Sequence, residues 1–336
     1  MVRTPSPTGR EEAISRLVEG EMRRAGFDEV RRDPIGNVLG FLHGRDPRLR
    51  LLFNGHIDHA ETGSMPDPYS GDLVDGSRFG REGTALVGRA ACDMKGAVAA
   101  MIYAAKAVRD AGTALAQSVV VTAVVKEEAA RGEGILYVLE EDGVRADMAG
   151  SGEATNLDVY VGHRGKLEFL VTTKGRACHA SNPGNGVNAI FLMQRFLESL
   201  QRDYELPSHE FLGDCTMTVI DIVARPGRLT PVVPDRCEIV LDRRYLPGES
   251  AESVEGEVRA LLDRLARDGG FEGDVSLLKD FPVLFCDPEE KVVELARGAR
   301  RKVMGDPGTP GAWRFGVDGT FIQKAGIPCV GFGPGS

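Results

Sequence analysis

The sequence predicts an α/β protein in which a smaller α+β domain is inserted into a larger domain. Strand-like and helix-like segments alternate in the first half of the chain, and near Gly165 the pattern changes to strands that alternate apolar and polar residues. At its end the chain returns to a long helix and a buried strand. We therefore expect a discontinuous larger domain of residues 1–165 and 281–336, with residues 166–280 as the inserted domain.

The first half of the chain supplies most elements of the larger domain. Apolar residues at helical spacing predict helices at residues 11–25, 94–109 and 134–142. Strands are predicted at residues 37–42, 49–53 and 118–125. The last of these, SVVVTAVV, is apolar almost throughout, as expected for a strand covered on both faces. The alanine-rich helix at 94–109 is expected to be buried on most sides.

The inserted segment has a different pattern. Its predicted strands alternate apolar and polar residues, as in KLEFLVTTKG, CTMTVIDIVA and CEIVLDRRYL. Helices are predicted at residues 186–202 and 250–267. After the DVSLLKD segment, a helix at 288–304 and the strand IPCVGFG return to the larger domain.

Length, charge and cysteine content exclude several classes of protein. The 336 residues suffice for two domains, and the net charge of -9 argues against nucleic acid or an anionic membrane as the main partner. No run of 18 apolar residues is found, and the N-terminus lacks the apolar region of a signal peptide, so a soluble cytoplasmic protein is expected. The six scattered cysteines form no CxxC pair and fit a reducing compartment.

Polar side chains gather where the predicted strands end. They are His56, Asp58, Asp93, the pair Glu127 and Glu128, and Glu153. Any one of these positions could be a solvated loop after a strand. Several of them at the carboxyl ends of one sheet favour a metal or ligand site, because open α/β sheets bind their ligands at those ends.

Five motifs, in their order along the chain, resemble those of the co-catalytic zinc amidohydrolases of peptidase clan MH: GHIDHAETG, GRAACDMKGA, EEAARGEG, GEAT and ACHASNPGNGVNAI. That family includes acetylornithine deacetylase, succinyl-diaminopimelate desuccinylase and the glutamate carboxypeptidases. The resemblance covers nearly the whole chain and implies a three-layer α/β/α zinc-exopeptidase-like catalytic domain with an inserted dimerisation or lid domain. Within the family, DPYSGDL, HEFLGDCTMTV and LDRRYLPGES look closest to the selenium-metabolism hydrolases.

The resemblance implies two zinc ions per subunit, which Co2+ or Mn2+ can replace. His56 and Glu153 would bind the first zinc and Glu128 the second, while Asp93 would bridge both. Asp58 would hold the His56 imidazole in place, as acceptors beside metal-bound histidines do. The resemblance makes Glu127 the general base that takes a proton from the bridging water.

Three residues of the inserted domain extend the site by the same resemblance. His179 would stabilise the oxyanion across a dimer interface, and Asn188 would accompany it. Arg244 would bind the substrate carboxylate, a task that suits its planar guanidinium. Each of the three could instead be an ordinary surface residue. The remaining histidines match no motif and are expected to be structural: His43, His59, His163 and His209.

The sequence also departs from the family pattern. Alanines replace common glycines at Ala90 and Ala97, Lys126 precedes the glutamate pair, and Ala154 replaces a proline. Relatives carry a last zinc-binding histidine beyond the FGPG turn, whereas this sequence ends at Ser336. We expect either that the chain lacks its natural ends or that the protein lacks one metal ligand.

The leading hypothesis is a homodimeric, dinuclear zinc amidohydrolase that cleaves an amide bond in a small N-acyl amino acid or peptide with a free carboxylate. A dipeptidase or carboxypeptidase is an alternative within the enzymes. A non-catalytic binding relative with an incomplete metal site is an alternative from another class. The presence of Glu127 disfavours that last reading, because a binding module needs no general base.

Overall fold

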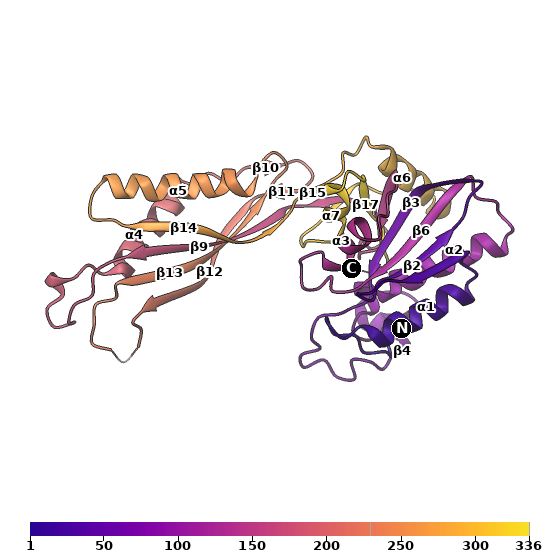
Figure 1. Cartoon of the computed structure of the whole chain (residues 1–336), viewed down its shortest axis with the longest axis horizontal. Helices are drawn as coiled ribbons and strands as arrows, with labels where there is room; N and C mark the ends of the chain where they lie inside the picture. The colour runs from indigo at the N-terminus through magenta and orange to yellow at the C-terminus, as the bar shows by residue number, and fades with distance from the viewer. Residues whose placement is uncertain (229, 336) are drawn as a thin grey trace. The chain divides into compact units, whose positions relative to one another are not determined.

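The computed structural model describes residues 1–228 and 230–335, which form two compact units (Figure 1). The first unit comprises Met1–His163 together with the segment from Leu284 onward, and the second is Arg164–Val283. Each unit contains its own sheet and its own apolar core.

The described residues of the first unit form a nine-stranded mixed sheet. Its order is β1-β2-β6-β3-β7-β17-β8-β15, and β16 also pairs with β8. The central strands β6, β3 and β7 run parallel, so their carboxyl ends lie at the same edge of the sheet. The strands are β1 (Glu29–Arg32), β2 (Val38–Leu42), β3 (Asp46–His56), β6 (Gln117–Val124), β7 (Met148–Ser151), β8 (Tyr160–His163), β15 (Leu284–Phe285), β16 (Gly311–Trp313) and β17 (Cys329–Gly331).

Helices cover both faces of this sheet. They are α1 (Glu12–Arg24), α2 (Gly96–Asp110), α3 (Glu133–Glu140), α6 (Lys291–Met304) and α7 (Gly319–Lys324). Helices α1, α2 and α6 pack on the face of the sheet that carries Phe53. Helix α7 packs against strands β7, β15 and β17 and also contacts α3. The predicted three-layer α/β/α arrangement is therefore confirmed.

Helix α2 is less buried than the sequence predicts. Val98 and Ile102 point into the core, but Tyr103 is 55% exposed. Ala100 and Ala104 line an apolar groove with a volume of about 480 Å³. Alanine is apolar yet small, so an alanine-rich helix can look buried all round in sequence while leaving one face open at little cost.

The second unit is a four-stranded antiparallel sheet with two helices on one face (Figure 1). Its order is β12-β13-β9-β14, with bounds β9 (Gly165–Lys174), β12 (Thr216–Arg225), β13 (Arg236–Tyr245) and β14 (Gly273–Phe281). Helices α4 (Ala189–Asp203) and α5 (Ala251–Arg267) enclose a core that includes Phe169, Phe196 and Leu241. Helix α4 begins later than predicted because Asn188 is its N-cap and accepts the N–H of Ile190.

Two short antiparallel pairs complete the strands of the described residues: β4 (Asp72–Asp75) with β5 (Thr84–Val87), and β10 (Ser208–His209) with β11 (Gly213–Asp214). Short helical turns lie at η1 (Gly76–Phe79), η2 (Ala91–Lys95) and η3 (Pro183–Asn185). Within residues 1–228 and 230–335, none of the helices has the length and apolar character that crossing a bilayer requires.

Candidate metal centre

The polar residues predicted at strand ends lie together at one edge of the large sheet. His56 is the last residue of β3, while Glu127 follows β6 and Glu153 follows β7. These three strands are neighbours in the sheet and run parallel, which brings their carboxyl ends together. Asp93 reaches the same edge from the turn η2 that precedes α2.

His56, Asp93 and Glu153 form the geometric centre of the site. The Nε2 atom of His56 lies 2.7 Å from Oδ1 of Asp93 and 3.5 Å from Oε1 of Glu153. One ligand atom from each of the three residues lies within 4.8 Å of the other two, close enough to hold one metal ion. His56 and Glu153 are buried, whereas the Asp93 side chain is 55% exposed, so the cluster opens to solvent on the Asp93 side.

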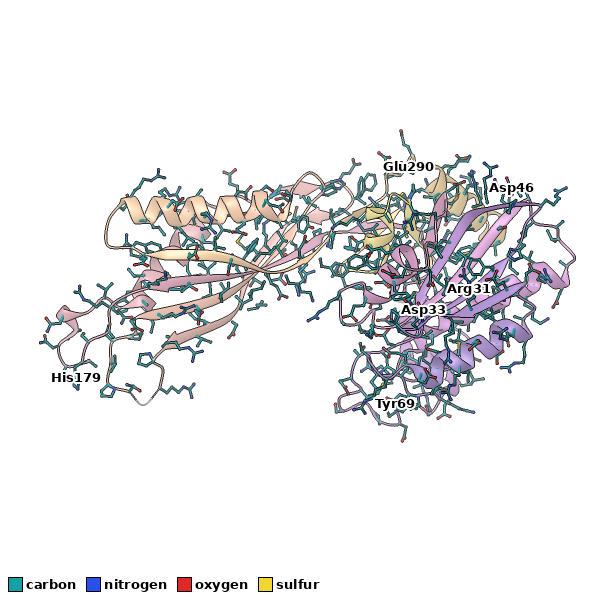
Figure 2. All side chains as sticks on the ribbon, viewed as in Figure 1. Arg31, Asp33, Asp46, Tyr69, His179 and Glu290 are labelled. Atoms are coloured by element: carbon teal, nitrogen blue, oxygen red, sulfur yellow. The ribbon has the colours of Figure 1, made fainter. Side chains whose placement is uncertain are left out.

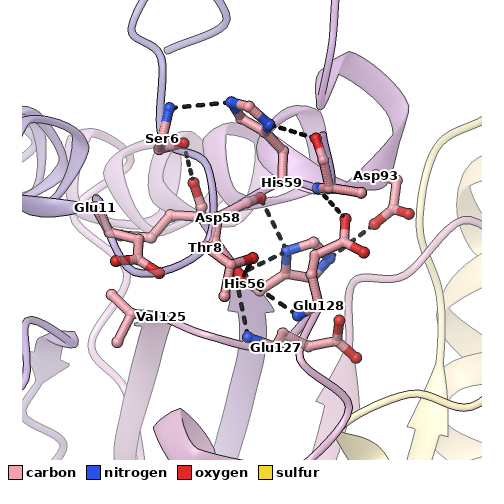
Figure 3. Close-up of polar contacts among 12 residues, drawn as sticks. Ser6, Thr8, Glu11, His56, Asp58, His59, Asp93, Val125, Glu127 and Glu128 are labelled. Carbon is pink, nitrogen blue, oxygen red and sulfur yellow. Dashed lines mark hydrogen bonds and ion pairs between the residues drawn. The ribbon is translucent and has the colours of Figure 1, made fainter. Parts of the chain in front are cut away.

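Asp58 lies behind His56 and connects it to the glutamate pair (Figure 3). The Nδ1 atom of His56 is 3.2 Å from the carbonyl oxygen of Asp58 and 3.4 Å from its Oδ1. The backbone N–H groups of Glu127 and Glu128 donate to the Asp58 carboxylate at 3.1 and 3.2 Å. The position of this one buried carboxylate is therefore coupled to three residues of the predicted site.

The electrostatics of the cluster are dominated by buried negative charge. Burial lowers the pKa of His56, but hydrogen bonds with Asp58 and Asp93 together with nearby carboxylates outweigh it and raise that pKa well above its usual value. Burial raises the pKa of Glu153 to about 8, although the charge of His56 opposes this. Burial likewise raises the pKa of Glu127 well above its usual value. A bound cation would favour the ionised forms of these carboxylates.

Asp318 is a buried acidic residue of this region that sequence reasoning missed. It lies just before α7 and is 3% exposed, and its Oδ2 has no hydrogen-bond partner among the described residues. Burial raises its pKa to about 7, against the charge of His56 and a hydrogen bond with Asn54. The only sequence signal is an aspartate shortly after a strand, in the glycine-containing segment RFGVDGTF.

Glu128, the predicted ligand of the second zinc, is not a member of the three-residue group found within residues 1–228 and 230–335. One of its carboxylate oxygens instead accepts the N–H of Ala60 at 3.0 Å. Ala90 has φ of 64°, a left-handed conformation that glycine adopts at lower cost, so alanine at this position carries a backbone strain that glycine would avoid.

Comparisons with known proteins agree with this fold. Residues 161–270 match the model of the peptidase dimerisation domain found in M20 peptidases. The chain is 33% identical over 356 residues to the uncharacterized protein YgeY of Escherichia coli K12, covering 100% of this chain and 85% of that protein. The chain belongs to the M20 peptidase family.

Two further M20 relatives span nearly the whole chain. N-formyl-4-amino-5-aminomethyl-2-methylpyrimidine deformylase of Bacillus subtilis strain 168 is 27% identical over 370 residues, covering 99% of this chain and 84% of that protein. The solved structure of Bacillus subtilis YXEP, a dinuclear metal binding M20 peptidase, superposes with a TM-score of 0.72 at 16% identity, covering 99% and 87% of the two chains. As an M20 protein, the chain is a hydrolase of amide or peptide bonds.

The remaining predicted residues of this M20 hydrolase lie in its second unit. His179 is exposed in the loop between β9 and α4 (Figure 2), where its Nδ1 accepts the N–H of Ser181 at 3.2 Å. Arg244 lies on β13, and its Nε is 2.9 Å from Oδ1 of Asp242. The side-chain oxygen of Asn188 is occupied as the N-cap of α4.

Proposed function

We propose that the protein is a dinuclear zinc amidohydrolase that cleaves the amide bond of an N-acyl amino acid or small peptide with a free carboxylate. The observation that carries the proposal is the group of His56, Asp93 and Glu153, with the half-buried Glu127 near it. Deformylase activity in one M20 relative and peptidase activity in another support hydrolysis of a C–N bond.

The residues present fit a divalent cation. An imidazole nitrogen and carboxylate oxygens are typical zinc donors, and the three ligand atoms already lie within 4.8 Å of one another. His56 and Glu153 would hold the first cation, and Asp93 would reach a second one together with Glu128. Zinc is proposed for both, with Co2+ or Mn2+ as replacements. When bound, two such cations polarise an amide carbonyl and acidify a water.

The side chains of the protein would manage the protons of the reaction. Glu127 would accept a proton from the attacking water and deliver it to the leaving nitrogen, as one carboxylate can do in both steps. Asp58 would keep the His56 ring oriented and its Nδ1 protonated, which leaves Nε2 free as a ligand.

Arg244 supports a substrate with a free carboxylate. Asp242 holds the guanidinium through Nε at 2.9 Å and Nη2 at 3.4 Å, which leaves the other N–H groups of the fork for a ligand. The deacylase and the dipeptidase or carboxypeptidase alternatives both use such a contact. The narrower likeness to selenium-metabolism hydrolases remains a hypothesis about the substrate.

His179 supports a composite site in a homodimer, with Asn188 beside it. Nδ1 accepts the Ser181 N–H at 3.2 Å and lies 2.7 Å from the Ser181 hydroxyl, which favours the tautomer with a proton on Nε2, the one that can donate to an oxyanion. The edge strand β12 exposes Ile220 and Ile222 by 54% and 57%, which favours pairing with a second copy. Mixing inactive Glu127→Ala and His179→Ala chains should restore part of the activity, whereas no recovery after proven subunit exchange would mean that His179 acts within its own chain or not at all.

Metal analysis tests the proposed function. The wild-type protein should bind two zinc ions per chain and hydrolyse some members of a panel of N-acyl amino acids and dipeptides. Asp93→Ala should lose both metals, because only Asp93 would contact each of them. Two zinc ions retained by Asp93→Ala would refute the bridging role. Zinc binding without hydrolysis of any panel member would favour the non-catalytic relative.

A further inference from the structure

The Asp58 carboxylate has an additional partner that comes from the first residues of the chain. Thr8 donates its hydroxyl to Oδ2 of Asp58 at 2.8 Å (Figure 3). The same oxygen accepts the N–H of Glu128, and Oδ1 accepts the N–H of Glu127. Thr8 is exposed whereas Asp58 is 0% exposed, so the threonine lies between a buried carboxylate and solvent.

The segment Thr4–Glu11, here called the N-terminal strap, is fixed in register against the residues that follow β3. Its backbone pairs with His59 in both directions, from the His59 N–H to the Ser6 carbonyl at 3.1 Å and from the Thr8 N–H to the His59 carbonyl at 3.3 Å. The Ser6 hydroxyl donates to the Ile57 carbonyl at 2.7 Å. The strap is therefore bonded to Ile57 and His59, the residues immediately before and after Asp58.

Two buried side chains, which lie close in sequence to predicted site residues, form hydrogen bonds with the backbone of the strap. His59 is 1% exposed; its Nε2 accepts the N–H of Ser6 at 3.0 Å, and its Nδ1 donates to the carbonyl of Ala60 at 2.7 Å. Lys95, which is 1% exposed, donates from Nζ to the carbonyl of Thr4 at 2.9 Å. Lys95 lies two residues after Asp93, so the start of the strap is tied to the segment that carries one predicted ligand and its middle to the segment that follows His56.

We propose that the N-terminal strap is a positioning element of the metal centre and that Thr8 is the positioning residue that fixes the Asp58 carboxylate. This inference rests on the proposed function. A hydroxyl bond to an ionised carboxylate is short and directional, so it restricts rotation of the Asp58 carboxylate. Because Asp58 also contacts the His56 ring and the backbone of Glu127 and Glu128, that restriction orients the imidazole and the glutamate pair together.

The experiment compares the full-length Thr8→Val, Thr8→Ser and Thr113→Val variants with wild type. Valine has the shape of threonine without the hydroxyl, and serine keeps the donor. Thr113 is exposed after the end of α2 and provides a matched control for the same change at a surface position. Two quantities are measured: zinc affinity by competition with a chelator, and hydrogen exchange of the Glu127 and Glu128 amides in metal-free protein.

Thr8→Val should weaken zinc binding roughly 10-fold, the lower end of the loss found when partners of metal ligands are removed, because Thr8 acts through Asp58. It should also speed exchange of the two amides roughly 10-fold, because their common acceptor is less constrained. Thr8→Ser and Thr113→Val should both resemble wild type.

Wild-type values for Thr8→Val in both measurements, or equal effects in Thr8→Val and Thr8→Ser, would overturn the positioning role. The amide-exchange measurement needs no metal, so it tests Thr8 even if the proposed function fails. Wild-type protein that binds no zinc, together with faster exchange in Thr8→Val, would reject the metal centre and retain Thr8 as the residue that positions Asp58. Stoichiometric zinc binding by wild type, with neither zinc affinity nor amide exchange changed in Thr8→Val, would retain the metal centre and reject Thr8 as the residue that positions Asp58.

Discussion

Two clusters of charge, each around a buried cationic side chain and one in each unit, are built in opposite ways. Around His56 and the buried Lys95, the first unit gathers a larger number of carboxylates: Asp58, Asp93, Glu127, Glu153 and Asp318. In the second unit the 0%-exposed Arg243 is matched by Glu249, with Nη2 to Oε1 at 2.7 Å, and by the Tyr204 ring, whose centroid lies 5.9 Å from the guanidinium carbon.

The difference shows that charge imbalance, rather than burial of charge, distinguishes a candidate site from a structural cluster. A matched buried pair with good geometry offsets the cost of removing both ions from water. An unmatched group of carboxylates is costly in the isolated fold and becomes favourable only with protons or cations. The same neutralising substitution should therefore act in opposite directions in the two clusters.

The largest expected effect comes from neutralising the proposed base. Glu127→Gln should lower kcat roughly 10²–10⁴-fold, the usual loss when a general base is removed. It should retain zinc and raise the thermal stability of the metal-free protein, because one of several repelling carboxylates has gone. Turnover, metal content and melting temperature test this together. Loss of zinc equal to that in Glu128→Gln would contradict the division of labour between the two glutamates.

Neutralising the matched cluster should destabilise the protein instead. Glu249→Gln leaves Arg243 buried without its counter-charge, which costs about 3–5 kcal/mol when such a pair is broken. Urea unfolding with a probe in the second unit measures this loss, and zinc content should not change. A change below about 1 kcal/mol, the size of a surface ion pair, would remove the contrast between the clusters.

A smaller effect is expected from pH in the metal-free protein. The pKa values of Glu153 and His56 are raised in the fold, so their contributions to stability are present at low pH and lost as pH rises through the folded values. Between pH 5 and 8 the free energy of unfolding should fall on the order of 2–4 kcal/mol, since one pKa unit corresponds to about 1.4 kcal/mol.

Zinc should reverse this trend, because cations bind the deprotonated ligands and gain affinity as protons leave. Glu153→Gln should flatten the metal-free profile, since the substituted side chain no longer titrates. Parallel pH profiles for wild type and Glu153→Gln would show that the carboxylate excess does not govern stability.

The sequence predicts long elements and strand-end residues well. Strands such as 118–125 are clear because their apolar runs are long, and His56 and Glu153 are identifiable because each lies at or just beyond the carboxyl end of a strand. The two- to four-residue strands β8, β15 and β16 carry too few residues for a period to appear. Their places in the sheet depend on pairing between distant segments.

Thr8 and Asp318 were missed for a related reason. Nothing local to residue 8 indicates a hydrogen bond to residue 58, and Asp318 lies in a glycine-containing loop that looks solvent-exposed in sequence. The resemblance alone indicates Asn188 as a site residue, whereas its N-cap geometry follows from local structure, because asparagine directly before an apolar helix is a typical N-cap.

The order of the large sheet has a consequence for synthesis of the chain. Strand β8 pairs with β15, β16 and β17, all of which are translated after Val283. At roughly 5–20 residues per second, the ribosome needs on the order of ten seconds to make the intervening unit. By the end of that interval the inserted unit has all four strands of its sheet and can finish folding first. The nascent first unit meanwhile presents β7 as an open edge, the kind of surface that chaperones must shield.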